Sequence, residues 1–222
     1  MEHKQQNNQL YDLLKTYFPK GSNYLILSND LLKVNSYFMN QIYIQTSSIH
    51  KKEIWGEKSR LTTQYGKEIG WVPDQFDHIF FADTVRGEIA EALINRNNEL
   101  IPEEADFLEA DNLIAELKIE HLSQSNPFFL SEGETKLLWF ISQFAKAPQY
   151  MIITNLTAGL SRARVLLVID FILKSLSIGK IGRIMSPTYI IGLSPKDHDF
   201  ITMLQQTGHW HILSKIDFLT SL

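Results

Sequence analysis

Short apolar runs recur along the chain and alternate with longer stretches whose apolar residues repeat at helical spacing. Apolar runs of this length without alternating polar positions are typical of strands that are buried on both faces. Helices must then cover both faces of the sheet that the strands form, which is the arrangement of α/β proteins. The pattern therefore predicts an α/β fold with a mostly parallel sheet flanked by helices. The predicted strands cover residues 24–27, 42–44, 69–72, 150–153 and 189–191.

The length of the chain, 222 residues, suits a single domain over residues 1–222. The part between the third and fourth predicted strands has a different pattern, with short helical stretches and no clear buried strand. We therefore expect a helical subdomain at residues 76–147, inserted between two strands of the sheet. Its predicted helical stretches are residues 84–94, 102–107 and 110–118.

Two further helices have recognisable start signals. Ser131 and Glu134 have the spacing of a capping box, in which each side chain bonds the backbone of the other residue. The apolar pattern that follows stops before Pro148. Ser161 is a second N-cap candidate, for a helix that we expect to end near Gly179.

Composition excludes several classes of site. The chain has no cysteine, which removes disulfides, thiolate metal sites and cysteine nucleophiles and fits a reducing compartment. The net charge of −4 gives no reason to expect a nucleic-acid partner. The polar start of the chain lacks the apolar core of a signal peptide, and no apolar run reaches membrane-spanning length. We therefore expect a cytoplasmic protein.

The most informative stretch begins with Leu130-Ser131-Glu132-Gly133-Glu134. A long helix, Pro148 and a hydrophobic strand follow, and then the loop Asn155-Leu156-Thr157-Ala158-Gly159-Leu160-Ser161. This order and spacing resembles the ATP-binding cassette (ABC) ATPase family. In that family an L-S-G-G-Q/E signature opens a helix, and a Walker B strand and a P-T-A-G-L-D loop come later. Here Glu132 replaces one glycine of the signature. The resemblance covers roughly residues 20 to 215.

A second segment also resembles this family, and most closely its importers. Residues 69–75, followed by Phe80-Phe81 and the stretch 84–89, look like the Q-loop region, where a strand leads into the helical subdomain. Counting back from Thr84, Asp74 occupies the family's glutamine position and Gln75 lies one residue later. Asp74 and Gln75 are both candidates for the residue that faces the nucleotide.

The phosphate-binding loop of the family is missing. That loop has the form G-x-x-x-x-G-K-[ST], and its backbone N–H groups, lysine and hydroxyl hold the phosphates and Mg²⁺. After the first core strand this chain has no glycine between Ser22 and Trp55. Without glycine a loop cannot easily adopt the close-approach backbone of a phosphate cradle, and Asp30 would repel a triphosphate. Lys33 is expected to be a solvated helix lysine.

The catalytic positions of the family are replaced as well. By alignment, Thr154 stands where the family has its Mg²⁺-binding aspartate, and Asn155 stands where it has its catalytic glutamate. Ser161 replaces the aspartate of the loop, and Leu193 or Ser194 replaces the later histidine. Neither Thr154 nor Asn155 can act as a carboxylate base. We therefore expect no catalytic residues and no nucleotide cofactor bound by the chain's own site.

The signature differs in kind, because in this family it acts on a nucleotide held by the other subunit. The resemblance implies that Ser131 and Gly133, within the segment Ser131-Glu132-Gly133-Glu134, contact the γ-phosphate of a partner's ATP. Unpaired N–H groups and the positive helix end favour an anion there. The acidic side chain of Glu132 opposes this unless it turns away. ATP and Mg²⁺ would then be shared with a partner subunit.

Two functional hypotheses follow. In the first, the chain is a degenerate ABC subunit that pairs, as a homo- or heterodimer, with an ABC ATPase subunit. It would also dock on a membrane permease through the region from Asp74 to Glu88, which places it at the inner face of the membrane. In the second, which Glu132 and Ser161 favour, the chain is a regulatory or scaffold protein with no nucleotide role.

A conventional ATPase with a misplaced phosphate loop is a poorer interpretation, because neither Gly66-Lys67 nor Gly179-Lys180 is followed by Ser or Thr. No metal site is expected either. His209 and His211 fit an exposed strand face, and the stretch 197–199 fits a polar loop.

Overall fold

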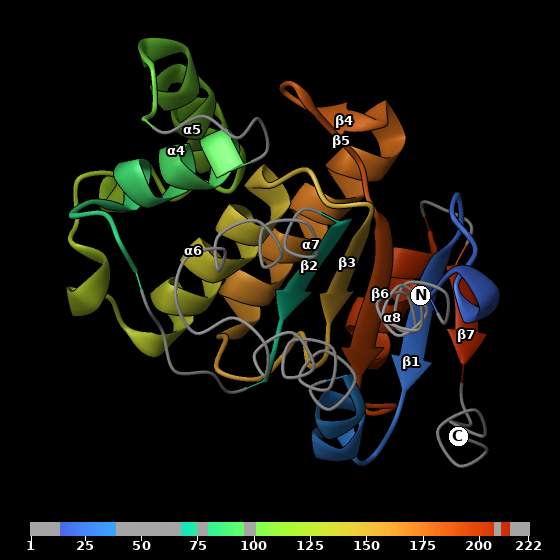
Figure 1. The fold of residues 1–222 in the computed structure, drawn as a ribbon. Helices are drawn as coiled ribbons and strands as arrows, with labels where there is room; N and C mark the ends of the chain where they lie inside the picture. The colour runs from blue at the N-terminus through green and yellow to red at the C-terminus, as the bar shows by residue number, and fades with distance from the viewer. Residues whose placement is uncertain (1–13, 39–67, 75–79, 96–100, 207–209, 214–222) are drawn as a thin grey trace, which may run out of the picture.

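A computed structural model describes residues 14–38, 68–74, 80–95, 101–206 and 210–213. Within these residues a five-stranded sheet has the order β2-β3-β6-β1-β7, and every neighbouring pair is parallel (Figure 1). This confirms the predicted α/β fold. The strands are β1 (Asn23–Leu27), β2 (Ile69–Val72), β3 (Tyr150–Ile153), β6 (Thr188–Leu193) and β7 (Trp210–Leu213).

The central strands are buried on both faces, which explains their uninterrupted apolar runs. Side chains alternate between two clusters: Met151 and Ile153 join one, whereas Tyr150 and Ile152 join the other. Strand β1 divides in the same way, with Leu25 on the first side.

Helices cover both faces of the sheet. The larger cluster is covered by α6 (Glu132–Ala145), α7 (Arg162–Ile178) and α8 (His198–Gln205), with α4 (Val85–Asn95) and α5 (Glu104–Glu116) beyond α6. The other face is covered by the helical residues 14–17 and 31–38, whose side chains Leu14, Val34 and Phe38 are buried.

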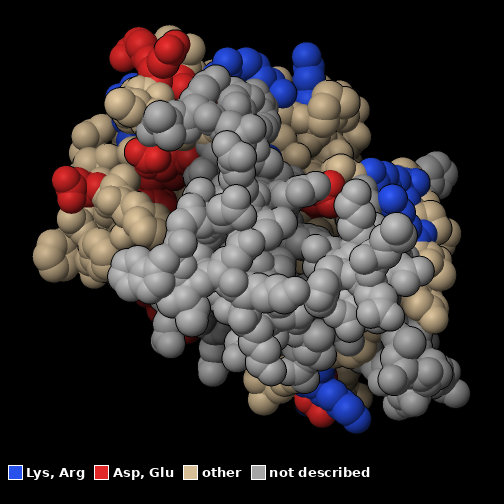
Figure 2. Space-filling model, in the orientation of Figure 1, with Lys and Arg blue, Asp and Glu red and all other residues tan. Residues whose placement is uncertain are grey.

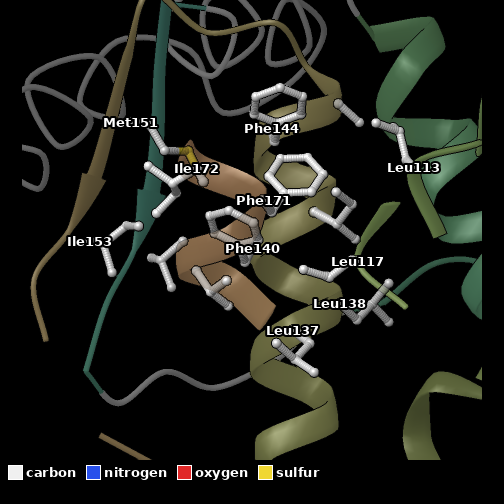
Figure 3. Packing of buried hydrophobic residues seen from close by; sticks show 14 of the residues in the cluster. Leu113, Leu117, Leu137, Leu138, Phe140, Phe144, Met151, Ile153, Phe171 and Ile172 are labelled. Atoms are coloured by element: carbon white, nitrogen blue, oxygen red, sulfur yellow. The ribbon is translucent and has the colours of Figure 1, made fainter. Parts of the chain in front are cut away.

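Three phenylalanine rings join α6 to α7 (Figure 3). The ring centroid of Phe171 lies 5.5 Å from that of Phe140 and 4.9 Å from that of Phe144, both edge to face. These rings lie between the side chains of β3 and those of Leu113 in α5 and Leu117 just after it. Edge-to-face aromatic packing fixes ring orientation as well as burying area, so α6 and α7 are held in one register.

The predicted helix boundaries are confirmed. Ser131 is the N-cap of α6 and forms a capping box with Glu134, and α6 ends at Ala145, before Pro148. Ser161 is the N-cap of α7, which ends at Gly179 in a left-handed conformation with φ +77°.

The described residues between β2 and β3 contain helices and no strand. They are α4, α5, α6 and the short 3₁₀ helices η3 (Glu120–Leu122) and η4 (Pro127–Phe129). The limits 76–147 of a helical subdomain stay a prediction.

Two sequence expectations were wrong, and one lies outside the described residues. The stretches 102–107 and 110–118 form one helix, α5, because the residues between them continue its buried face through Glu109. The stretch 197–199 is not a loop, because α8 begins at His198. The predicted strand 42–44 lies outside the described residues.

Among the described residues, no helix combines the length and apolar character that crossing a membrane requires.

A hairpin of β4 (Lys180–Ile181) and β5 (Ile184–Met185) fastens α5 to the rest of the molecule. The side chains of Asp106 and Glu109 are only 9% and 6% exposed, and Arg183 in the hairpin turn faces both. The backbone N–H of Arg183 donates to Glu109 Oε1 at 2.8 Å. Figure 2 shows Lys and Arg near this hairpin beside the acidic end of α5. Because buried carboxylates need partners, this contact determines where α5 lies.

Replacing Arg183 should therefore destabilise the chain. We expect Arg183→Met to lower the free energy of unfolding by about 1–3 kcal/mol, because it leaves buried carboxylate oxygens unpaired. Urea denaturation measures this. The control Lys180→Met removes an exposed lysine of the same hairpin and should change little. Adding Glu109→Gln to Arg183→Met should recover part of the loss. Equal effects of the Arg183 and Lys180 substitutions would contradict the interpretation.

Candidate functional site

The carboxyl ends of four strands meet at one edge of the sheet. Val72 is in register with Ile153, Ile153 with Ile191, and Leu27 with Leu193. Ligands of open α/β sheets bind outside this edge, so the residues that follow these strands form the candidate site.

The turn after β1 has only three residues, Ser28 to Asp30, before helical residues begin at Leu31. Asp30 Oδ1 accepts the backbone N–H of Lys33 at 3.0 Å, and the Asp30 N–H donates to Ser28 Oγ at 3.1 Å. The carboxylate of Asp30 thus takes the helix N-terminus that a phosphate occupies in a phosphate-binding loop. Lys33 is exposed on this helix, as expected.

Asn35 and Thr154 fill the space between this helix and the sheet. Thr154 is 1% exposed, and its hydroxyl donates to Asn35 Oδ1 at 2.8 Å. The backbone N–H of Asp74 donates to the same oxygen at 3.3 Å. The position aligned with a Mg²⁺-binding aspartate is therefore a buried hydroxyl whose partner lies within the chain.

Asn155 holds the loop that follows β3. Its Nδ2 donates to Asp74 Oδ1 at 3.3 Å. Its Oδ1 accepts the Ala158 N–H and the Thr157 hydroxyl, each at 3.3 Å. An amide cannot take a proton from water at neutral pH. Asn155 and Asp74 therefore form a structural pair. Gln75, the other candidate beside Asp74, lies outside the described residues.

Lys136 on α6 lies beneath the same loop and is only 4% exposed. Its Nζ donates to the carbonyl oxygens of Asn155 at 2.9 Å and Ala158 at 2.6 Å. Burial lowers the pKa of this ammonium to about 8, although the charges of Asp74 and Glu132 act in the opposite direction. Sequence reasoning missed Lys136. The available signal was a lysine on the otherwise apolar face of a helix.

The signature residues satisfy one another. Glu134 Oε2 accepts the Ser131 hydroxyl at 2.7 Å and the Ser131 backbone N–H at 2.9 Å. Arg164, on α7, donates to Glu134 Oε1 at 2.7 Å and to Ser131 Oγ at 3.4 Å. The bonds from Ser131, together with the charge of Arg164, lower the pKa of the Glu134 carboxyl group.

Gly133 and Gly159 allow α6 and the loop after β3 to approach closely. A Cβ at Gly133 would lie 2.4 Å from Arg164 Nη1 and 3.0 Å from the Gly159 carbonyl oxygen. Gly159 has φ +67°, and a Cβ there would lie 2.9 Å from Glu132 Oε1. Glu132 therefore lies beside the loop, the positive φ of Gly159 favours glycine, and a Cβ at Gly133 would crowd the Gly159 carbonyl oxygen.

The remaining aligned positions have local structural partners. Ser161 accepts the Arg164 N–H at 3.4 Å as the N-cap of α7. The Ser194 N–H donates to Asp197 Oδ2 at 3.1 Å, and Leu193 is buried at the end of β6. Across the described ranges no group of three or more His, Cys, Asp or Glu residues could hold a metal ion.

The described residues after β1 and β3 are already bonded within the chain. The turn after β1 is short, an internal carboxylate caps its helix, and no carboxylate follows β3. What the site can do is hold the strand ends, the loop 155–160 and the start of α6 in one hydrogen-bonded unit.

Comparisons with known proteins identify the fold. The architecture is similar to that of cbiO1 from Clostridium perfringens, part of the ABC transporter complex cbiONQ, with 17% identity and a TM-score of 0.55 over 88% of this chain and 74% of that chain. It is also similar to the ATP-binding cassette MJ0796 in a dimeric post-hydrolysis state bound to ADP and Pi, with 14% identity and a TM-score of 0.56 over 88% and 82% of the two chains. The chain has the ATP-binding cassette fold. The resemblance inferred from the motifs is thus confirmed.

A sequence match points the same way. Over 94 residues the chain is 34% identical to a putative ABC transporter ATP-binding protein of Methanopyrus kandleri. The match covers 42% of this chain and 34% of that protein, so it spans about a third of the relative's length. No protein-family model matches the chain. At 14–17% identity, the solved structures establish only the fold.

The buried ammonium of Lys136 makes stability depend on pH. Its pKa is about 8 in the folded chain and returns to 10.5 when the chain unfolds. Between these values only the unfolded chain keeps the proton, so rising pH favours the folded chain. We expect the free energy of unfolding, relative to Lys136→Met, to rise by about 3 kcal/mol from about pH 7 to about pH 10.5. Urea denaturation across this range measures the difference.

The matched control is Lys33→Met, because Lys33 is an exposed helix lysine. Its stability should follow that of the unmodified chain at every pH. Parallel curves for the chain and Lys136→Met would contradict the burial of a charged amine.

Proposed function

We propose that this chain is a degenerate ABC-type subunit that does not hydrolyse ATP by itself and acts as the asymmetric partner of an active ABC ATPase. The observation that carries the proposal is the filling of its own site. Asp30 caps the helix after β1, and Asn35, Thr154 and Asn155 bond one another or Asp74. If these internal contacts exclude Mg²⁺-ATP, the chain can contribute to hydrolysis only through a partner.

The edge that would face a partner supports the same proposal. Ser131 and Gly133 lie at the N-terminus of α6, where backbone N–H groups favour an anion. The carboxylate of Glu132 lies close to Gly159, since a Cβ on Gly159 would be 2.9 Å from Glu132 Oε1. Arg164 brings a cation to the same place, and its side chain is 31% exposed. The assembly would therefore hold ATP and Mg²⁺ in the partner's intact site.

Docking on a membrane permease is the second part of the proposal. Three phenylalanines near the start of α4 are strongly exposed: Phe81 by 85%, Phe128 by 65% and Phe129 by 89%. The ring centroids of Phe80 and Phe128 lie 6.3 Å apart, so η4 and the segment before α4 form one apolar surface. Exposed aromatic surface of this kind marks an interaction site. The chain would then work in the cytoplasm, at the inner face of the membrane.

A specific observation favours the alternative, a regulatory or scaffold protein without a nucleotide role. The Ser131 hydroxyl and N–H both donate to Glu134, so neither is free for a phosphate without breaking that contact. In this case the chain would bind the same partners and leave the partner's chemistry unchanged.

The isolated chain should not bind Mg²⁺-ATP with an affinity better than millimolar. The physical reason is that no described residue of its own site offers a phosphate cradle or a metal-binding carboxylate. Isothermal titration calorimetry of the purified chain with Mg²⁺-ATP checks this. Micromolar binding that is lost in Lys33→Met would show that the chain keeps a nucleotide site of its own.

If the signature residues act on ATP held by a partner subunit, which we call the trans role, the partner's ATPase rate should depend on them. In a complex reconstituted with an active ABC ATPase subunit, Ser131→Ala and Gly133→Ala should each lower the partner's ATPase rate at least about tenfold, as loss of transition-state contacts does. Ser177→Ala, on the exposed side of α7, is the control and should have no effect. An unchanged rate with intact assembly would favour the scaffold alternative.

A further inference from the structure

Lys136 has an arrangement that calls for a functional explanation. We propose that Lys136 is a positioning residue, whose ammonium holds the loop 155–160 against α6 and so keeps the partner-facing edge formed without bound nucleotide or metal. The inference rests on the proposed function in one respect, namely that this edge faces a partner subunit.

The geometry places one cation between two carbonyl groups of the loop. Lys136 Nζ lies 2.9 Å from the Asn155 oxygen and 2.6 Å from the Ala158 oxygen, and the side chain is almost fully buried. Two carbonyl oxygens that converge in this way repel each other unless a donor lies between them. Hydrogen bonds from a charged donor are the shorter and stronger kind.

The other hydrogen bonds of the loop are longer, and one of them joins the Thr157 hydroxyl to Asp197 Oδ2 at 3.4 Å. Within the loop, the Ala158 N–H lies 3.3 Å from Asn155 Oδ1, and the Leu160 N–H lies 3.4 Å from the Thr157 oxygen. Its beginning is fixed separately, because the Leu156 N–H donates to the Gly192 oxygen at 3.1 Å. The bond from Lys136 to the Ala158 oxygen, at 2.6 Å, is therefore the shortest hydrogen bond to the part of the loop beyond Leu156.

The same contact aligns the loop with the signature. Lys136 and Gly133 belong to one helix, and the Gly159 oxygen would lie 3.0 Å from a Cβ on Gly133. A loop that moved by an ångström would leave this close approach. Asp74 and Glu132 are the acidic residues whose charges act on the ammonium, so it also balances charge beneath the edge.

This arrangement assigns Lys136 a task that a bound ligand commonly performs at such a site. Here the cation that brings two backbone oxygens together and balances a carboxylate is the ammonium group of Lys136. The partner-facing edge is consequently present in the isolated chain, and assembly with a partner needs no nucleotide bound by this chain.

Amide exchange of the isolated chain, followed by NMR, tests the proposal. In Lys136→Met we expect exchange at Ala158 and Leu160 to accelerate at least about tenfold, because the loop loses its strongest hydrogen bonds. Exchange at Leu156 should stay the same, because its bond to Gly192 is untouched. The matched control is Lys146→Met, which removes a lysine at the other end of α6 and should leave all three amides unchanged.

A double variant separates positioning from simple stability. Adding Asp74→Asn to Lys136→Met removes a carboxylate that the ammonium balances, so the thermal midpoint should recover. Fast exchange at Ala158 and Leu160 should persist, because no donor has returned. If the double variant restores slow exchange together with the thermal midpoint, or if Lys136→Met leaves both amides protected, the proposal is wrong.

If Lys136→Met does not fold, Lys136→Gln replaces it, because glutamine keeps a hydrogen-bond donor and loses the charge. We expect exchange at Ala158 and Leu160 in this variant to be intermediate. Exchange as slow as in the unmodified chain would overturn the proposal. None of these measurements uses a partner. Failure of the Ser131→Ala test would therefore refute the trans role alone, whereas failure of the exchange test would refute the role of Lys136 alone.

Discussion

The carboxyl edge of a parallel sheet gathers polar groups that must find partners, and the rest of this site depends on how they do so. In a nucleotide-binding protein, phosphates and a metal ion supply many of those partners. Here the chain supplies them: Asp30 caps a helix, Asn35 accepts from Thr154, and Lys136 donates to two loop carbonyls. Buried polar groups that are fully satisfied hold a structure in one conformation. The edge is consequently formed without a ligand.

Hydrogen bonding within the chain has different consequences at the strand ends and at the start of α6. At the ends of β1 and β3, Asp30, Asn35 and Thr154 bond within the chain. At the start of α6 and in the loop 155–160, the same contacts preserve a close approach of two glycines that nothing in the chain's own site requires. This contrast between the two sides of the site is the physical basis of the proposed role with a partner.

The sequence predicted more of the fold than of the site. The apolar runs predicted β1, β2, β3 and β6, since continuous burial on both faces leaves little ambiguity. Ser131, Ser161 and Gly179 predicted helix ends, because caps are local interactions. Local patterns did not predict structure that depends on tertiary contacts. Glu109 lies on the buried face of α5 because it bonds Arg183, which is 74 residues away in the sequence. The stretch expected as a loop at 197–199 contains the start of α8, and the Asp197 side chain there accepts from Ser194 and Thr157 and does not cap the helix.

The sequence by itself predicted the cassette fold and shows no G-x-x-x-x-G-K-[ST] motif, because motif spacing and the lack of glycine between Ser22 and Trp55 are properties of the sequence. Only the tertiary structure decided what replaces the ligand. Asn35, Lys136 and Arg164 come from three separate helices, and nothing in their local sequence shows that they converge on one edge. Convergence depends on how the helices pack on the sheet, and that packing is set by the burial of the whole core.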